Sequence, residues 1–400
     1  MFELRPILSA LLRNKSGPLL IVLQLALTLA VVANAAFIIQ ERLAMMARDS
    51  GIPESELIGF TLAEMHMDKD LLAQRQIDEQ ALRAIPGVKD AVATNHLPLT
   101  SSGSSTTVSS EPNGEGRKLN VGYYTGNEHL FTTLGLSLSE GRTFDASDIR
   151  SGGHTSTPPS QVMLSRYSAD YLFPDSSAVG KHVYLRDEPI EVVGVYDRLQ
   201  TPWPHRTHSF ASALLPVEND RFFVRYIVRV DPAQRDAVMK QIESTLLALD
   251  PSRVITSLRH FDEIRERAYR NDRAMAVLLG VVIVLLLVVT ALGVVGLASY
   301  SVAQRRKQIG TRRALGATRS AIVRHFLTEN MMICLTGMGL GLLAGLGLNQ
   351  YLMHHYELSR LPLSYLGVTL AGLVLLSQCA AASPALRAAR VSPALATRSV

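Results

Sequence analysis

The residue types that usually carry chemistry are few in this sequence, and their spacing does not favour catalysis. The 400 residues contain no GxxxxGK[ST] phosphate-binding loop, no HExxH zinc motif and no G-x-S-x-G nucleophile turn. His205 and His208 have a spacing that would suit a metal in a rigid helix, but they lie in a proline-rich stretch. Cys334 and Cys379 lie in apolar runs, where sparse thiols are usually packing residues. We therefore expect no catalytic residue, no metal site and no cofactor bound by this chain.

Positive charge, by contrast, is concentrated in one segment, residues 302–329. Its basic side chains precede a single acid, Glu329, and they are Arg305, Arg306, Lys307, Arg312, Arg313, Arg319 and Arg324. Because apolar runs flank the segment on both sides, we interpret it as a short connector on one face of a membrane. Lysine and arginine in short connectors mark the cytoplasmic face. We therefore expect this segment and both chain ends in the cytoplasm.

The same segment has the pattern of two helices separated by a tight break. Val302, Ile309 and Leu315 recur at helical spacing among charges, which is typical of a helix lying in the membrane interface. Gly316 is suited to the left-handed conformation that ends such a helix, and Thr318 to capping the next one. An ordinary basic loop beside a membrane is the alternative interpretation.

The order of these residues resembles the signature of the FtsX-like, or MacB-like, permease family of ABC transporters. The matching positions are Arg305, Arg306, Ile309, Gly310, Arg313, Ala314, Leu315, Gly316, Ala317 and Glu329. In that family the segment is the coupling helix that seats on a separate ATPase, so the resemblance implies a partner that binds ATP and magnesium. The family usually has Glu before the Ile-Gly step, where this chain has Gln308. One polar contact with the ATPase is therefore expected to differ.

The elements that position this segment are four apolar runs of membrane length. The chain is 47% hydrophobic with a mean hydropathy of +0.16, which is high for a soluble domain. About 20 apolar residues span a bilayer as a helix. The predicted spans are residues 19–39, 274–299, 326–353 and 362–384. A cleavable signal peptide is the alternative for the first run, because Ala33-Asn34-Ala35 mimics a cleavage site, but polar positions in the run favour a retained helix.

The regions between the spans follow from this topology. On the cytoplasmic side we predict an amphipathic helix over 1–18, a coupling region over 300–325 and a tail over 385–400. On the periplasmic side we predict a MacB-like domain with stalk helices over 40–273 and a short loop over 354–361. The resemblance also implies an FtsX-like domain at about 274–393. Residues 40–273 hold 26 basic and 32 acidic side chains, so the net charge of +5 comes from the membrane-flanking segments. Such placement favours anionic lipid over nucleic acid as the partner of the basic residues.

The domain between the first two spans is expected to have mixed α/β structure. Helices are predicted over 71–85 and 233–249, and strands over 89–94, 190–196 and 222–230. The Gly/Ser-rich residues 101–116 indicate an exposed loop or hairpin tip. Residues 201–208, with the only tryptophan, indicate a loop that caps the core, or an exposed tip that binds a partner. Residues 259–273 predict a charged helix that continues into the second span and pairs with residues 40–48 as a stalk; a solvated helix end is the alternative.

Further motifs extend the resemblance to MacB-like permeases over most of the chain. In the periplasmic region they are residues 82–88 (LRAIPGV), 134–136 (LGL), 141–144 (GRTF) followed by Asp148, 180–181 (GK) and 192–195 (VVGV). After the last span, residues 383–398 are similar to the family's terminal pattern of Pro-Ala and Arg-Ala-Ala-Arg.

Two features within the third span point to packing and polarity. Gly337, Gly341 and Gly345 recur every four residues and would let another helix approach closely, either within the subunit or from a second copy. Glu329 is an ionisable residue at membrane depth, and we expect it to pair with Arg324 or Arg319.

The resemblance implies a membrane α-helical permease subunit of an ABC transporter that works by mechanotransmission and is not itself an enzyme. Its expected partners are a dimeric ABC ATPase, a second copy or a related permease, membrane lipids, and a periplasmic adaptor with an outer-membrane channel. Expected substrates are a peptide, an antibiotic or a lipoprotein-like molecule. The alternative is an FtsX-type regulator of a periplasmic peptidoglycan hydrolase. A transmembrane sensor would need a cytoplasmic output domain, and only short cytoplasmic segments are expected here.

Overall fold

The computed structural model describes residues 16–65, 70–152, 159–185, 187–356 and 359–390. Most of the predicted amphipathic helix over 1–18 and of the tail over 385–400 lies outside these residues. The chain divides into two compact units, Met1–Ala44 with Asp272–Val400, and Met45–Asn271. We call the first the helical unit and the second the α/β unit, and describe each by itself.

The described residues of the helical unit form four long helices and one short one. The long helices are α2 (Ser16–Met46), α8 (Arg270–Gln304), α10 (Arg319–Tyr356) and α11 (Leu363–Ala389), and the short one is α9 (Arg306–Ala314). Each long helix is long and apolar enough to cross a membrane, with a mean hydropathy between 1.7 and 3.2 in its most apolar stretch. This confirms the predicted four membrane helices with an α/β domain inserted between the first and the second.

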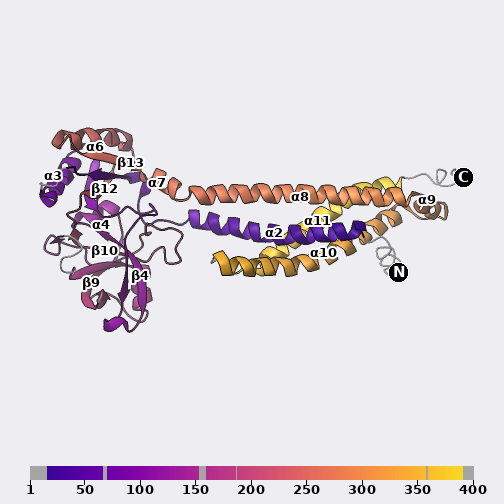
Figure 1. Cartoon of the computed structure of the whole chain (residues 1–400), viewed down its shortest axis with the longest axis horizontal. Coiled ribbons are helices and arrows are strands. Elements are labelled where there is room, and N and C mark those ends of the chain that lie inside the picture. Colours follow the sequence, from indigo (N-terminus) through magenta and orange to yellow (C-terminus); the bar gives the residue numbers. More distant parts are fainter. Residues whose placement is uncertain (1–15, 66–69, 153–158, 186, 357–358, 391–400) are drawn as a thin grey trace. The chain divides into compact units, whose positions relative to one another are not determined.

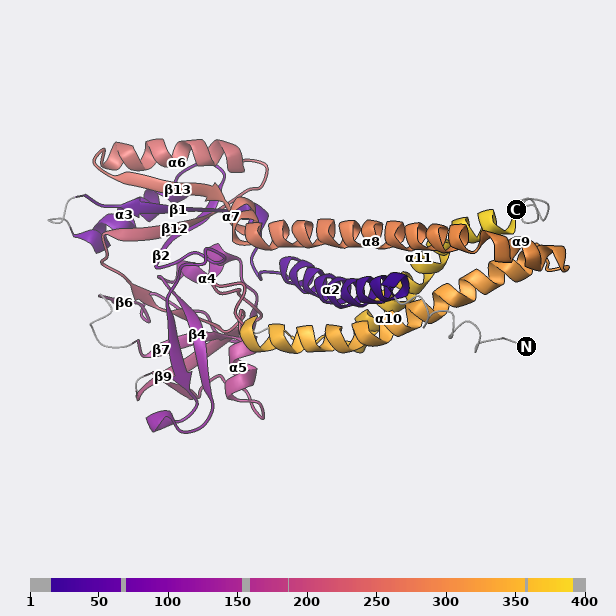
Figure 2. The same cartoon turned by 45° about the vertical axis from the view of Figure 1, so that its right-hand side comes forward.

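Helix α2 is the centre of the helical unit, and both views place it between α8 and α10 (Figures 1 and 2). Its residues Leu25 and Leu29 are fully buried among apolar side chains of the other three long helices. Polar contacts accompany this packing. The hydroxyls of Thr28 and Thr290 lie 2.9 Å apart, and Asn34 donates to the carbonyl of Gly345 on α10. Helix α8, by contrast, is only 11% buried in its most apolar stretch.

The α/β unit contains an antiparallel sheet in the order β13-β1-β12-β2. Its strands are β1 (Leu57–Ala63), β2 (Val88–Thr94), β12 (Phe223–Val230) and β13 (Val254–His260). Helices α3 (Leu71–Arg83) and α6 (Arg235–Leu249) bury leucine, valine and isoleucine against it. Both helices and strands β2 and β12 coincide closely with the sequence prediction, because each has clear apolar periodicity.

A second, mixed sheet has the order β5-β9-β7-β10-β4-β3-β8. Its strands are β3 (Ser105–Ser109), β4 (Lys118–Thr125), β5 (Leu138–Gly141), β7 (Gln161–Ser165), β8 (His182–Leu185), β9 (Glu188–Tyr196) and β10 (Ser212–Leu215). Strand β8 also pairs with β9, so six of these strands form a closed ring. Helix α5 (Arg166–Leu172) packs against this sheet.

Shorter elements complete the α/β unit. They are the 3-10 helices η1 (Glu54–Glu56) and η2 (Pro112–Gly114), helices α4 (His129–Leu134) and α7 (Phe261–Ala268), and the parallel strand pair β6 (Arg150–Ser151) and β11 (Val217–Glu218). A core shared by both sheets includes Leu57 and Ile227 of the first and Tyr124 and Leu214 of the second. The two sheets therefore form one compact unit.

Two sequence expectations need correction. Residues 101–116 are only partly a loop: residues 101–104 are irregular, β3 pairs with β4, and the residues between these strands form a hairpin tip, as one of the two alternatives predicted. The charged helix predicted over 259–273 is two helices, and its first two residues end β13. The break falls at Tyr269, which is 2% exposed and accepts a hydrogen bond from Gln200. Burying this ring in the core turns the chain where charge alone predicted continuity.

Candidate functional site

The sharpest local feature of the helical unit is the turn between α9 and α10. Gly316 has a φ of +94°, a conformation that side chains with a Cβ rarely adopt. Around it the amide of Ala317 donates to the carbonyl of Arg312, and that of Gly316 to the carbonyl of Arg313. This is the Schellman arrangement that ends a helix. The Thr318 hydroxyl then accepts from the amide of Ala321 and caps α10, as expected from the sequence.

One face of α9 is held against the rest of the helical unit. Ile309 is 5% exposed and packs with Ile322 on α10 and with Ala388 and Ala389 on α11. The Arg313 side chain donates to the carbonyl of Ala389 over 3.1 Å. These contacts fix the direction of α9 relative to the ends of two membrane-length helices.

The other face of α9 and the turn are open. Leu315 is 83% exposed, although it is a large apolar side chain. Arg306, Ala314 and Gly316 are exposed too, whereas Gly310 is buried and Ala317 is half-buried. The elbow, residues 305–318, therefore presents one exposed apolar side chain within an arginine-rich segment.

Glu329 lies on α10, past the end of the elbow. Its carboxylate is paired with Arg305 at 2.8 Å, and not with Arg319 or Arg324 as the sequence suggested. Arg305 lies between α8 and α9, so the ion pair ties the start of the elbow to α10. Both groups line a cavity that is also bounded by Tyr300, Gln304 and Asn330.

Three of the glycines of α10, Gly337, Gly341 and Gly345, face α2. A Cβ on Gly341 would lie 3.0 Å from backbone atoms of Ala26, and one on Gly337 would lie 3.0 Å from the carbonyl oxygen of Val22. Gly345 lies against Ala30 in the same way, at 3.4 Å. The structure thus uses this glycine stripe for packing within the chain. Gly339, on another face, has open space around it.

The domain ends of α2 and α8 are linked by ionic contacts. Within the helical unit, Arg42 Nη1 lies 2.7 Å from the carboxylate of Asp272, whose side chain is 4% exposed. Within the α/β unit, Arg265 of α7 donates to the carbonyls of Met46 and Arg48, and it also pairs with Glu54. The segment that follows α2 is therefore tied to the helix that precedes α8.

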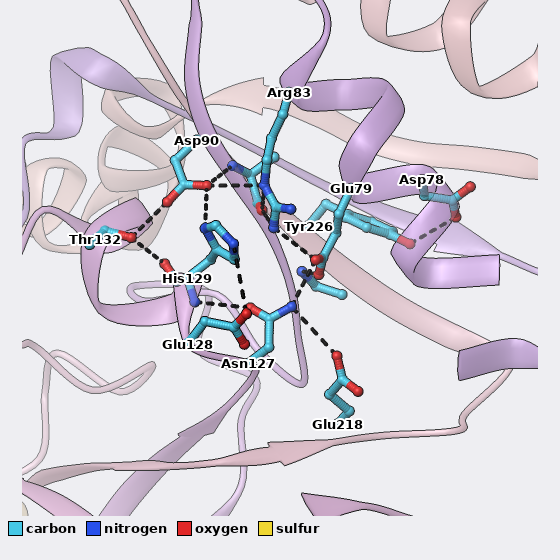
Figure 3. Close-up of polar contacts among 12 residues, drawn as sticks. Asp78, Glu79, Arg83, Asp90, Asn127, Glu128, His129, Thr132, Glu218 and Tyr226 are labelled. Carbon is cyan, nitrogen blue, oxygen red and sulfur yellow. Dashed lines mark hydrogen bonds and ion pairs between the residues drawn. The ribbon is translucent and has the colours of Figure 1, made fainter. Parts of the chain in front are cut away.

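A buried polar network in the α/β unit is the feature that sequence reasoning missed (Figure 3). Glu79 of α3 is 3% exposed, and it accepts hydrogen bonds from Arg83, from the amide of Ala93 and from Asn127. Asn127 in turn lies 3.5 Å from Glu218. Asn127 follows β4 of the second sheet and Glu218 belongs to β11 of the short strand pair, so Glu79 links the first sheet to both.

The pKa values of two carboxylates in this network, Glu79 and Asp90, are shifted in opposite directions. Burial raises the pKa of Glu79 above its ordinary value. Burial also acts to raise the pKa of Asp90, but a hydrogen bond from Thr132 and the nearby His129 lower it more, so the net shift is downward. The His129 ring lies 3.0 Å from Asp90. The only sequence signal for this network is a pair of adjacent acids, Asp78-Glu79, on a helix that must bury one face.

A second buried group lies beside it. Arg253 has a fully buried side chain with Glu64 at 2.8 Å and Asp78 at 2.7 Å, and Tyr226 donates to Asp78. Removing Arg253 would leave two buried carboxylates without their shared cation. Within the described residues no group of three or more His, Cys, Asp or Glu could hold a metal ion.

Comparisons with known proteins agree with this architecture. A family model described as MacB-like periplasmic core domain matches residues 20–245, which is more than half of the chain. A second model, described as FtsX-like permease C-terminal, matches residues 280–393 and so includes the elbow.

Relatives of known name give a similar result. The chain is 26% identical over 267 residues to the macrolide export ATP-binding/permease protein MacB of Neisseria gonorrhoeae, covering 65% of this chain and 40% of the relative. It is 30% identical over 229 residues to MacB of Chromobacterium violaceum, covering 55% and 34%. The chain thus spans about two fifths or less of the length of these relatives. The extracellular domain of the noncanonic ABC-type transporter YknZ aligns over 50% of this chain and 100% of its own, with 20% identity and a TM-score of 0.33.

Proposed function

This chain belongs to the family of permeases with a MacB-like periplasmic core domain and an FtsX-like C-terminal region, and from this premise we propose that it is the permease subunit of an ABC transporter that works by mechanotransmission. In this proposal a separate ATPase binds the elbow, and the movement of the elbow is carried along the helical unit to the α/β unit. The observation that carries the proposal is the exposed Leu315 at the tip of an otherwise basic, firmly anchored elbow.

The orientation follows from charge. The elbow carries the densest run of arginine and lysine, and such connectors lie on the cytoplasmic side. We therefore place the elbow and both chain ends in the cytoplasm and the α/β unit in the periplasm, with the four long helices in the inner membrane. A cytoplasmic elbow is accessible to an ATPase, which would supply the ATP and magnesium that no motif in this sequence binds.

Rigid contacts support the transmission step. Arg313 and Ile309 hold α9 against α10 and α11, and Arg305 bonds Glu329. At the other end of the long helices, Arg42 holds α2 to α8 through Asp272. A displacement of the elbow would therefore move helices as bodies, since each end is cross-tied.

The substrate class is proposed from the relatives alone. Those relatives are named as macrolide export proteins. We propose that this chain acts in the export of a peptide, an antibiotic or a lipoprotein-like molecule that is already on the periplasmic side. Two membrane halves are needed, so a second copy or a related permease is a proposed partner, with a periplasmic adaptor and an outer-membrane channel as further ones.

The test is a pull-down of the full chain from its native membrane, followed by an ATPase assay with the copurified partner. Leu315→Asn removes the apolar tip at a side chain that is 83% exposed. We expect at least a tenfold loss of affinity for the ATPase, because central apolar anchors commonly contribute about 2 kcal/mol or more. The matched control is Thr311→Asn, an exposed position on the same helix. Absence of an ATPase among the copurified proteins, or equal binding by both variants, would refute the proposal.

A further inference from the structure

We propose that a groove between the start of α10 and the end of α11 binds one anionic phospholipid, with its phosphate between Arg319 and Arg390 and an acyl chain along the groove floor. The groove has a volume of about 980 Å³. It lies on the elbow side of the helical unit, and its walls come from both helices. This site goes beyond the proposed function and does not depend on it.

The described walls of the groove are basic. Arg319 and Arg324 come from α10 and Arg390 follows α11, and no acidic side chain is among the described residues that line the groove. The neighbouring cavity differs, because there Arg305 is neutralised by Glu329 at 2.8 Å. An anionic group is therefore the complementary occupant of this groove and not of the other.

The end of α10 adds to this attraction. Thr318 and Ser320 also line the groove, and their hydroxyls are 3.1 Å apart at the start of a 38-residue helix. The first amides of a helix lack intrahelical acceptors and carry a partial positive charge. The Thr318 hydroxyl already caps the amide of Ala321, so the attraction for a phosphate oxygen comes from the charge of the helix end as a whole and from the two hydroxyls.

Apolar side chains of both helices also line the groove, and we call them its floor. Val323, Leu327 and Met331 recur every four residues on α10, with Arg324 beside them, and Leu386 of α11 is 53% exposed. Because α10 is long and apolar enough to cross a membrane, this floor extends toward the hydrocarbon region. A ligand with an anionic head and a long apolar body satisfies both parts. An acidic protein segment would leave the floor unfilled, so the geometry favours lipid over the ATPase.

The experiment is native mass spectrometry of the full chain in detergent, titrated with dioleoylphosphatidylglycerol or with dioleoylphosphatidylcholine. The two lipids share acyl chains, so any difference comes from headgroup charge. We expect one tightly held phosphatidylglycerol per chain, bound at least about tenfold better than phosphatidylcholine. The double variant Arg319→Gln with Arg390→Gln should lose this preference, because each arginine near an anionic lipid contributes about fivefold.

The matched control is Lys307→Gln with Arg312→Gln, which removes the same charge from exposed positions outside the groove. It should change phosphatidylglycerol binding by less than about twofold. Equal retention of the two lipids, or equal losses in both double variants, would overturn the proposal in favour of nonspecific charge. If glycerol phosphate alone displaced the bound phosphatidylglycerol, the groove would be a site for a free anion and not for a lipid. If the groove double variant lost ATPase binding but retained phosphatidylglycerol, the groove would instead be a binding site for the ATPase.

Discussion

Glu79 shows how a single side chain joins the two sheets of the α/β unit. Its carboxylate accepts from Arg83 on its own helix, from the backbone of β2 and from Asn127 beside the second sheet. Burial still disfavours its charge and raises its pKa above the ordinary 4.5. The sequence could not reveal this role, because Glu79, Asn127 and Glu218 are far apart in the chain and meet only after both sheets have formed.

The raised pKa predicts a definite sign for the effect of pH. The folded state binds the Glu79 proton more tightly than the unfolded state does, so this residue makes the free energy of unfolding fall as the pH rises above 4.5 toward the raised native pKa. Glu79→Gln does not titrate and should lack this part of the fall. The measurement is thermal or urea unfolding of the full chain in detergent from pH 4.5 to 7.5, followed by the fluorescence of the only tryptophan, Trp203.

Glu115→Gln serves as the control, because Glu115 is exposed at the β3–β4 hairpin. Its unfolding curves should keep the pH dependence of the unchanged protein. The idea fails if Glu79→Gln and the unchanged protein have parallel stability profiles across this pH range.

Among the elements, α10 shows most clearly what the sequence can predict. One of its faces packs on α2, and it begins after the turn at Gly316. The four-residue glycine spacing predicted a close helix contact, but whether the contact lay within the chain or between copies needed the three-dimensional packing. Apolar periodicity placed α3, α6, β2 and β12 well. The same reasoning wrongly predicted one helix over 259–273, because no glycine or proline lies at the break. The break occurs at Tyr269 because its ring is buried in the core, where it accepts a hydrogen bond from Gln200.

The glycine contact predicts a strong difference between two neighbouring positions of α10. Gly341→Leu would place its Cβ against the backbone of Ala26 and force α2 and α10 apart, at a cost of about 1–3 kcal/mol. Gly339→Leu adds the same side chain where nothing lies within 4 Å. Thermal aggregation of the full chain in detergent, detected by size-exclusion chromatography after heating, should therefore begin at a lower temperature for the first variant only. Equal behaviour of both variants would argue against tight α2–α10 packing.

At the scale of the whole molecule, the resemblance read from the elbow and from the short periplasmic motifs identified the family, and the four apolar runs gave the membrane helices. Scattered motifs succeed here because each lies in the expected order between the expected spans. Pairings between distant residues remained hidden. Arg305 was a better partner for Glu329 than the arginines close to it in sequence, because the elbow folds back onto α10.

The tie between Arg42 and Asp272 predicts a measurable loosening at the ends of α2 and α8. Asp272→Asn removes a carboxylate that is 4% exposed, so Arg42 loses its ionic partner there. We expect faster amide hydrogen exchange in the last turn of α2 and the first turn of α8, by about tenfold, with unchanged exchange at the elbow. Mass spectrometry of the exchanging full chain in detergent would measure it.

Asp262→Asn is the matched control, because Asp262 pairs with Arg235 at 2.8 Å but is 47% exposed. This variant should leave the exchange at both helix ends unchanged. Indistinguishable exchange in the two variants would mean that apolar packing alone holds these helix ends.

The central place of α2 has a consequence for how the protein is made. Thr28 finds its hydroxyl partner 262 residues later in the chain, and Asn34 finds the carbonyl of Gly345 311 residues later. At a synthesis rate of about 5–20 residues per second, the first helix therefore waits on the order of tens of seconds before its neighbours emerge from the ribosome. Throughout that interval its polar side chains face lipid or the insertion machinery. A nascent chain stalled before α10 would thus be expected to engage membrane chaperones through the very helix that later becomes the most sheltered.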